Sequence, residues 1–171
     1  MKSAKIHFEQ NIVRVKNLGA IYKSVNSQTT QILDLSDILR AQYVMLVSAL
    51  DHFIHENNIE PYKDNIWLDY QIRYKNSFKS FQQANKIEEA MLLIIEKDIW
   101  EELSSFINQE SKMLKNQLNL IVDRRNQIAH EADIKFEDKE LRDIRSDDID
   151  NSIIFIELLV KAIFEISELK K

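Results

Sequence analysis

The segment that decides the fold is "LKNQLNLIVDRRNQIAH", which runs from Leu114 to His130. A helix turns by ~100° per residue, so residues three and four apart share one face. One such stripe consists of Leu114, Leu118, Ile121, Arg125 and Ile128. The spacing therefore predicts a long amphipathic helix over about 110–130, with one arginine on a face that is otherwise apolar.

Three other segments have the same helical periodicity and are expected to form long helices. They cover about 3–22, 36–56 and 146–169. Ser36 is expected to be the N-cap of the second of these helices, because serine accepts hydrogen bonds from the free amides of a first turn. The polar segment 23–31, "KSVNSQTTQ", is expected to be the loop that precedes it.

Short helices are expected between the long ones. Asn85 is followed by Glu88, and Asp98 by Glu101, which matches an N-cap residue answered by Glu three residues later. The aromatic residues of segment 65–83 have no clean period, so this part is expected to be short helix and loop.

Composition favours helices throughout the chain. The 171 residues include only one glycine and one proline, so the turn chemistry that sheets need is nearly absent. We therefore predict an all-α protein, a bundle of four long helices with short inserted helices. The length is that of one domain, expected to cover residues 1–171.

Composition also excludes several classes of function. The absence of cysteine excludes disulfides, thiolate metal sites and cysteine nucleophiles, and fits a reducing cytosol. A net charge of −5 argues against a broad basic surface, so any contact with RNA or DNA must be local. Charged residues interrupt the most apolar run, 153–166, and the N-terminus has no apolar core of the signal-peptide type. We expect a cytoplasmic protein with no membrane span.

The segment "RRNQIAHEAD", residues 124–133, contains the candidate site. Arg125 lies on the core stripe, and Asn126 and His130 lie four residues apart on its flank. An Arg and a His with four residues between them occur by chance in many helical proteins, but Asp51 similarly interrupts an apolar face of the second long helix. Because isolated buried charges are costly, we predict a direct or water-bridged ion pair between Asp51 and Arg125.

Metal binding is an alternative for the segment "DHFIHE", residues 51–56. Asp51 with His55, and His52 with Glu56, have the four-residue spacing that can hold a divalent metal inside a bundle. A di-iron bundle needs carboxylates from further helices, which the sequence does not supply. A solvated helix end is the favoured interpretation, and we expect no metal and no cofactor.

Other charged residues are interpreted as ordinary surface groups. The segment 135–150, "KFEDKELRDIRSDDID", is expected to be a solvated linker with a helix cap. Arg142 and Arg145 are expected to balance their acidic neighbours rather than bind phosphate. His7 is expected to be a partly exposed helix residue.

The "RRNQIAHEAD" segment resembles the signature of HEPN domains, which is Arg, a polar residue that is often Asn, a few residues and then His. The order of "DILRAQYVMLVSALDHFIHE", "NSFKSFQQANKIEEAM" and "DIWEEL" around it is similar to the RiboL-PSP-HEPN branch. The resemblance implies an all-α bundle, commonly dimeric. It implies a metal-independent endoribonuclease that acts as a toxin or antiviral effector. The alternative is a noncatalytic module that binds a protein partner or RNA, since some HEPN domains have lost catalysis.

The resemblance also implies roles for individual residues. Arg125 and His130 would be catalytic, Asn126 would be the intervening polar residue, and Asp51 would be the acidic residue facing them. Such groups can cleave RNA through its own 2′-hydroxyl, with histidine moving protons and arginine binding the phosphate. One histidine cannot act on both sides of the phosphorus, so a homodimer is expected. The expected partners are an RNA substrate and an antitoxin or sensor protein. The match is weakest in the aromatic insert 65–81, where the choice of substrate or partner is expected to lie.

Overall fold

The computed structural model describes residues 2–28 and 34–169, whose regular structure is helical apart from one isolated bridge between Ile134 and Leu141. The helices are α1 (Lys2–Gln28), α2 (Ser36–Ile59), η1 (Glu60–Tyr62, a short 3-10 helix), α3 (Ile66–Asn76), α4 (Ala84–Met91), α5 (Ile99–Ile107), α6 (Ser111–His130) and α7 (Ser146–Leu169). Four of them are long and the others are short. The prediction of an all-α bundle of this kind is confirmed.

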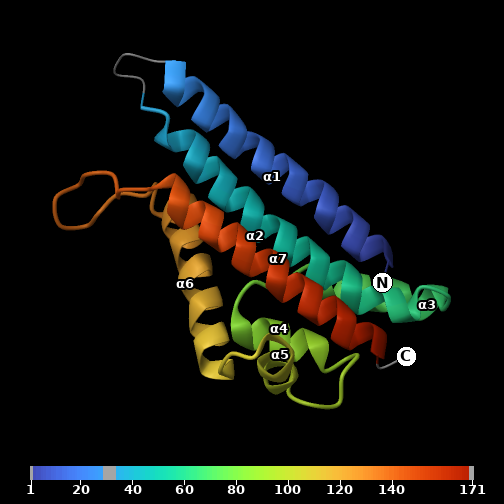
Figure 1. Ribbon diagram of the computed structural model, residues 1–171. Helices are drawn as coiled ribbons and strands as arrows, with labels where there is room; N and C mark the ends of the chain where they lie inside the picture. The colour runs from blue at the N-terminus through green and yellow to red at the C-terminus, as the bar shows by residue number, and fades with distance from the viewer. Residues whose placement is uncertain (1, 29–33, 170–171) are drawn as a thin grey trace.

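Helix α2 is the central element of the bundle (Figure 1). α1 lies along one side of it, and α6 and α7 pack on other sides. The only glycine, Gly19, lies where α1 approaches α2 closely, because a Cβ there would come within 2.7 Å of Nε2 of Gln42. The side chains of Phe53, Trp100 and Ile163 are among the fully buried members of one hydrophobic cluster between these helices.

Two of the predicted helix caps are wrong. Leu35 and Gln83 occupy the cap positions of α2 and α4, so Ser36 and Asn85 lie inside the helices. The first amide of α4 donates to Oδ1 of Asn119 on α6 at 3.1 Å, which is a tertiary contact. A side chain of another helix thus caps the start of α4, and the local sequence cannot predict such a contact.

The cap predicted for α5 is confirmed, because the Asp98 carboxylate accepts a hydrogen bond from the Trp100 amide at 2.8 Å. α3 begins in the same way, with the Asn65 side chain accepting from the Leu68 amide at 3.1 Å.

The first long helix extends further than its sequence pattern predicted. α1 continues to Gln28, so residues 23–28 of the expected loop are helical, and residues 29–31 lie outside the described part of the chain. Segment 65–83 is α3 followed by irregular structure over 77–83. Among residues 2–28 and 34–169, none of the helices has the length and apolar content needed to cross a bilayer.

Candidate active-site cleft

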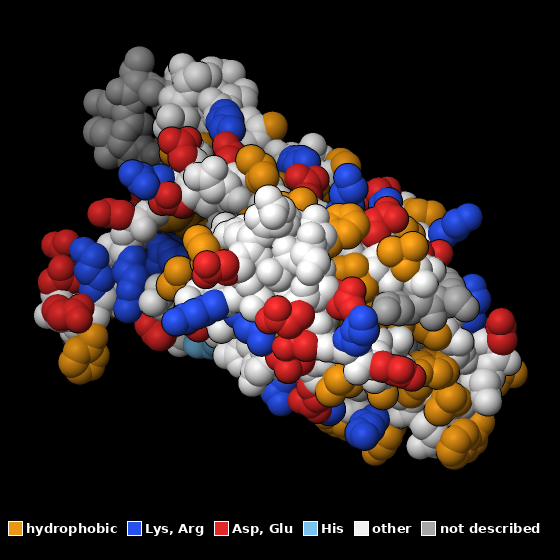
Figure 2. Space-filling view, turned by 60° about the horizontal axis from the view of Figure 1, so that its bottom comes forward, with side chains coloured by type: hydrophobic (Ala, Val, Ile, Leu, Met, Phe, Trp, Pro, Cys, Tyr) orange, Lys and Arg blue, Asp and Glu red, His pale blue; other side chains and the backbone are white. Residues whose placement is uncertain are grey.

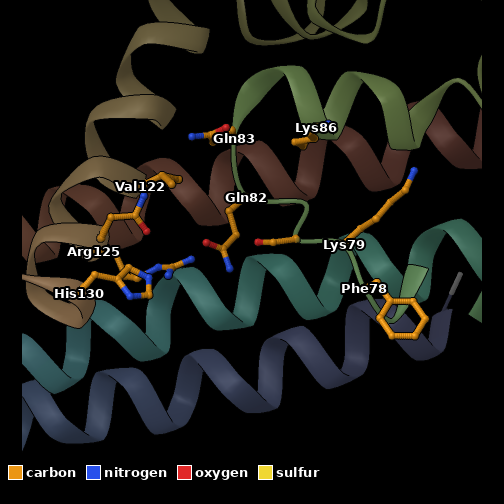
Figure 3. A pocket seen from close by; sticks show the side chains of 10 residues that line it. Phe78, Lys79, Gln82, Gln83, Lys86, Val122, Arg125 and His130 are labelled. Atoms are coloured by element: carbon orange, nitrogen blue, oxygen red, sulfur yellow. The ribbon is translucent and has the colours of Figure 1, made fainter. Parts of the chain in front are cut away.

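Arg125, Asn126 and His130 line one cleft of about 490 Å³ between the end of α6 and the segment 77–83. The remaining lining residues are Phe78, Lys79, Ser80, Gln82, Gln83, Lys86 and Val122. Figure 3 shows the Arg125 and His130 side chains projecting from the last turns of α6 toward Gln82. The structure therefore brings together three of the four residues that the sequence singled out.

The three side chains make no hydrogen bond or ion pair with any residue in the described ranges. Arg125 is half-buried, and this burial lowers the pKa of its guanidinium, while the nearby charge of Asp51 raises it. A cation that is partly withdrawn from water without a direct partner is costly. An anionic ligand in the cleft would offset that cost.

Asp51 supports the cleft wall and does not contact Arg125 directly. Its Oδ1 accepts from the Phe81 amide at 2.7 Å, and its Oδ2 from Nε2 of Gln82 at 2.9 Å. No direct ion pair between Asp51 and Arg125 is present, because donors of segment 77–83 bind both carboxylate oxygens, and the water-bridged form of the pair stays a prediction. His55 supports the same segment, since its Nε2 lies 3.2 Å from the Lys79 carbonyl oxygen. Asp51 thus positions the wall and contributes a nearby negative charge.

The cleft has a positive balance in an acidic chain. Its lining contains Lys79, Lys86 and Arg125 but no carboxylate. Lys79 and Lys86 both pair with Glu89, at 2.7 and 2.9 Å, and these two hydrogen bonds lower the pKa of Glu89 to about 2. Figure 2 shows a face of the molecule on which acidic and basic side chains are interspersed, with hydrophobic side chains gathered toward the lower right. Positive charge is therefore concentrated in the cleft lining and is not spread over this face.

A buried ion cluster fixes the end of α6 next to the cleft. Asp133 has no exposed surface and accepts from Nε of Arg40 at 2.7 Å and from both terminal nitrogens of Arg124. Its backbone has φ 58°, a left-handed conformation that Asp tolerates better than most residues. This cluster therefore fixes the backbone at Asp133, three residues after His130.

Sequence reasoning missed this cluster, although it expected a buried acid and base between two helices. The local signal was the pair formed by Arg124 and Asp133, nine residues apart at the two ends of the motif. Arg40 is 93 residues away from Asp133, and no spacing rule could have found it.

Arg142 and Arg145 are engaged with neighbouring groups. Arg145 binds both carboxylate oxygens of Asp148, at 3.1 and 2.9 Å, which raises the pKa of Arg145 and lowers that of Asp148. Arg142 donates to the Ile134 carbonyl at 2.7 Å and lies 3.2 Å from Glu131. They balance acidic and carbonyl groups, as the sequence predicted.

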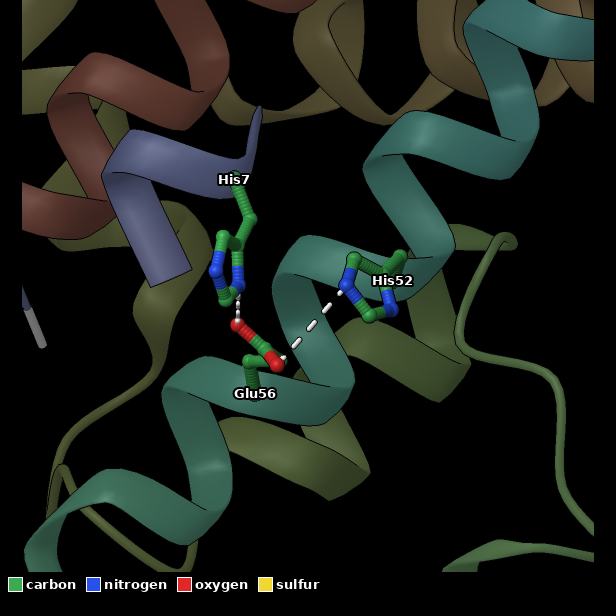
Figure 4. A group of neighbouring side chains, drawn as sticks. All are labelled: His7, His52 and Glu56. Atoms are coloured by element: carbon green, nitrogen blue, oxygen red, sulfur yellow. Dashed lines mark hydrogen bonds and ion pairs between the residues drawn. The ribbon is translucent and has the colours of Figure 1, made fainter. Parts of the chain in front are cut away.

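His7 of α1 joins the predicted His52 and Glu56 pair of α2 (Figure 4). Nδ1 of His7 lies 2.7 Å from Oε2 of Glu56, and Nε2 of His52 lies 3.7 Å from Oε1. These side chains are outside the cleft lining and have the ligand types that a metal ion would require. The other pair of the "DHFIHE" segment, Asp51 and His55, faces the wall segment 77–83.

Comparison with curated proteins and with solved structures gave no significant match. The family model described as RiboL-PSP-HEPN matches residues 9–168. The matched part contains the whole cleft lining, the supporting Asp51 and the buried cluster around Asp133. This chain therefore belongs to the RiboL-PSP-HEPN family.

Proposed function

We propose that this protein is a metal-independent endoribonuclease that acts as a toxin or antiviral defence effector. HEPN domains are often ribonucleases. The observation that carries the proposal is the common cleft of Arg125, Asn126 and His130, whose side chains have no partner in the described parts of the chain. The neighbouring Arg124, by contrast, is engaged by Asp133. Three polar side chains that line one cleft without a partner in the described parts of the chain are available to bind a polar ligand.

The reaction uses the 2′-hydroxyl of the RNA as the nucleophile. Its oxygen attacks the adjacent phosphorus as the bond from phosphorus to the 5′-oxygen breaks, which leaves a 2′,3′-cyclic phosphate and a 5′-hydroxyl. His130 transfers a proton, either from the 2′-hydroxyl or to the leaving oxygen. Arg125 presents two parallel donors to the phosphate and stabilises its additional charge. Asn126 offers an amide donor beside them.

A decisive experiment is cleavage of end-labelled mixed RNA by the purified protein in EDTA, beside His130→Ala and Arg125→Ala. Arg14→Ala is a matched control, because Arg14 is exposed on α1 and outside the cleft. We expect cleavage by the wild type and by Arg14→Ala, with loss of at least a hundredfold in the two cleft variants. Equal cleavage by all four proteins, or no cleavage by the wild type, contradicts the proposal.

The cellular role is tested by expression of the same variants. We propose that the protein acts on RNA in the cytoplasm, where an antitoxin or sensor protein would control it. Growth arrest that His130→Ala abolishes supports the nuclease. Growth arrest that this variant retains supports a noncatalytic interaction module.

A further inference from the structure

Four aromatic side chains form an exposed row along α3 and the residues that follow it. This aromatic ladder consists of Trp67, Tyr70, Tyr74 and Phe78, with Trp67 69% and Phe78 79% exposed. The rings of Tyr70 and Tyr74 are nearly parallel, with centroids 6.4 Å apart, and the ring of Phe78 meets Tyr74 edge-on at 5.5 Å. Monomeric proteins rarely expose aromatic rings in an ordered row, so the ladder is a candidate binding surface.

The ladder continues into the candidate active site. Phe78 is its last member and also lines the cleft, where Lys79 and Lys86 lie nearby. Figure 3 shows Phe78 on the wall segment, at the opposite side of the cleft from Arg125 and His130. Lys75 and Lys79 line an adjoining hollow of about 230 Å³ beside α3, together with Glu89, which pairs with Lys79. A row of rings therefore leads to the groups proposed to bind phosphate, with lysines along its course.

We infer that the aromatic ladder binds the bases of single-stranded RNA next to the bond that is cleaved. Aromatic rings combined with cations are the surface that single strands need, because bases stack on rings while cations bind the backbone. Duplex RNA keeps its bases stacked on one another and cannot offer them to the rings. The ladder therefore directs the enzyme to unpaired segments. The position of the cleaved bond in this inference rests on the proposed nuclease function.

Trp67 provides a direct probe of the ladder. The chain has two tryptophans, and the other, Trp100, is fully buried, so quenching of the emission by RNA reports on Trp67. The experiment titrates full-length His130→Ala, which leaves RNA intact, with a single-stranded oligonucleotide and with the same sequence in a duplex. We expect quenching by the single strand and little by the duplex.

Substitutions in the ladder test whether RNA binding depends on stacking of the bases on its rings. Added to His130→Ala, Tyr74→Ala should weaken single-strand binding by about tenfold or more, while Tyr74→Phe, which keeps the ring, should not. Phe106→Ala is the matched control, because Phe106 is an exposed aromatic on α5 outside the ladder. Equal binding by all of these variants overturns the inference. So does the finding that Tyr74→Ala binds RNA normally but changes the oligomeric mass, which would make the ladder a protein interface.

Cleavage assays separate this inference from the proposed function. If the wild type cleaves RNA and Tyr74→Ala cleaves long single strands equally well, the nuclease stands and the ladder is overturned. If the wild type cleaves nothing but single strands still quench Trp67, the ladder stands as a binding site and the nuclease is overturned.

A second inference depends on a different part of the molecule. His7, His52 and Glu56 offer two imidazole nitrogens and a carboxylate oxygen, with these atoms all within 4.8 Å of one another. Zn²⁺ binds such ligands at about 2.0–2.2 Å, so the three ligand atoms would have to move slightly closer together. The side chains can make this movement because none of them is fully buried. We propose that this triad binds a divalent transition metal such as Zn²⁺ and fastens α1 to α2. The site is separate from the cleft and has no part in RNA cleavage.

Isothermal titration of full-length metal-free protein with Zn²⁺ tests the second inference. We expect one strong site per chain, and a rise in the melting temperature on binding. His7→Ala and Glu56→Gln should lose both, whereas His130→Ala should keep both. The site is disproved if Zn²⁺ does not bind, or if it binds His7→Ala as well as the wild type.

Discussion

Arg124 and Arg125 are neighbours in sequence, but α6 turns them toward different surroundings. The guanidinium of Arg124 donates hydrogen bonds to the Asp133 carboxylate and to the Asp143 carbonyl. Arg125 lines the cleft and has no partner among the described residues. The same side chain thus has a structural role at one position and a candidate functional role at the next. The difference follows from the ~100° that separates consecutive helical residues.

This difference gives a paired prediction. Arg124→Ala leaves Asp133 buried with one partner fewer, so it should lower the free energy of unfolding by about 3–5 kcal/mol. Arg125→Ala removes an unpaired cation, so it should leave stability nearly unchanged and abolish RNA cleavage. Urea unfolding monitored by circular dichroism, combined with cleavage assays, measures both effects. Similar stability losses in the two variants would refute the assignment.

Asp51 should act through the position of the cleft wall. Asp51→Ala removes the acceptor of two hydrogen bonds from segment 77–83, so we expect a stability loss of roughly 2–4 kcal/mol and weaker cleavage. Asp51→Asn keeps one acceptor oxygen and should retain most of the stability. A difference in RNA cleavage between Asp51→Asn and the wild type then measures the effect of the negative charge beside Arg125. If Asp51→Ala folds as stably as the wild type, the hydrogen bonds to the wall are unimportant.

At the level of residues, the sequence predicted what helical periodicity encodes. The intrusion of Arg125 on an apolar stripe, and the proximity of Asn126 and His130, follow from one helix. The missing direct contact between Arg125 and Asp51 could not be predicted in this way, because segment 77–83 reaches Asp51 first. A charge on an apolar stripe therefore does not identify which residue will contact it.

At the level of elements, α2, α6 and α7 were predicted well because each buries a continuous apolar stripe. α3 had no such signal. Its aromatic face is turned to solvent, and Asn76 is its single buried residue. Burial-based periodicity therefore cannot detect a helix whose apolar side faces solvent. The starts of α2 and α4 were missed because their caps lack side-chain hydrogen bonds.

The ion pair between α4 and the cleft wall should depend on pH. Lys79 and Lys86 lower the pKa of Glu89 from 4.5 to about 2. A lowered pKa in the folded state means that the ionised carboxylate stabilises the fold above about pH 4.5 and that this contribution is lost as the pH falls toward 2. A carboxyl titration of Glu89 by NMR should give a midpoint well below that of a free Glu. The difference in melting temperature between the wild type and Glu89→Gln should shrink over the same interval, and a difference that is constant from pH 7 to pH 2 would exclude the effect.

At the level of the whole molecule, the proposed nuclease reaction calls for more acid and base groups than one cleft offers. In-line displacement at phosphorus needs a base on one side and an acid on the other, and the cleft contains a single histidine, His130. His130 is exposed at the last residue of α6, where the His130 of a partner could approach it. A two-fold axis beside the cleft would supply both groups and double the local positive charge. We therefore propose a homodimer with a composite site.

Light scattering at micromolar concentration should give twice the mass of one chain. A stronger test is activity in mixtures of the wild type with an excess of His130→Ala after subunit exchange. A mixed dimer holds only one His130, so cleavage should fall by more than the dilution of wild-type chains explains. A loss that only follows the dilution would mean that each chain works alone. A persistent monomer that cleaves RNA would exclude the composite site, and His130 would then need an acid or base from elsewhere in its own chain.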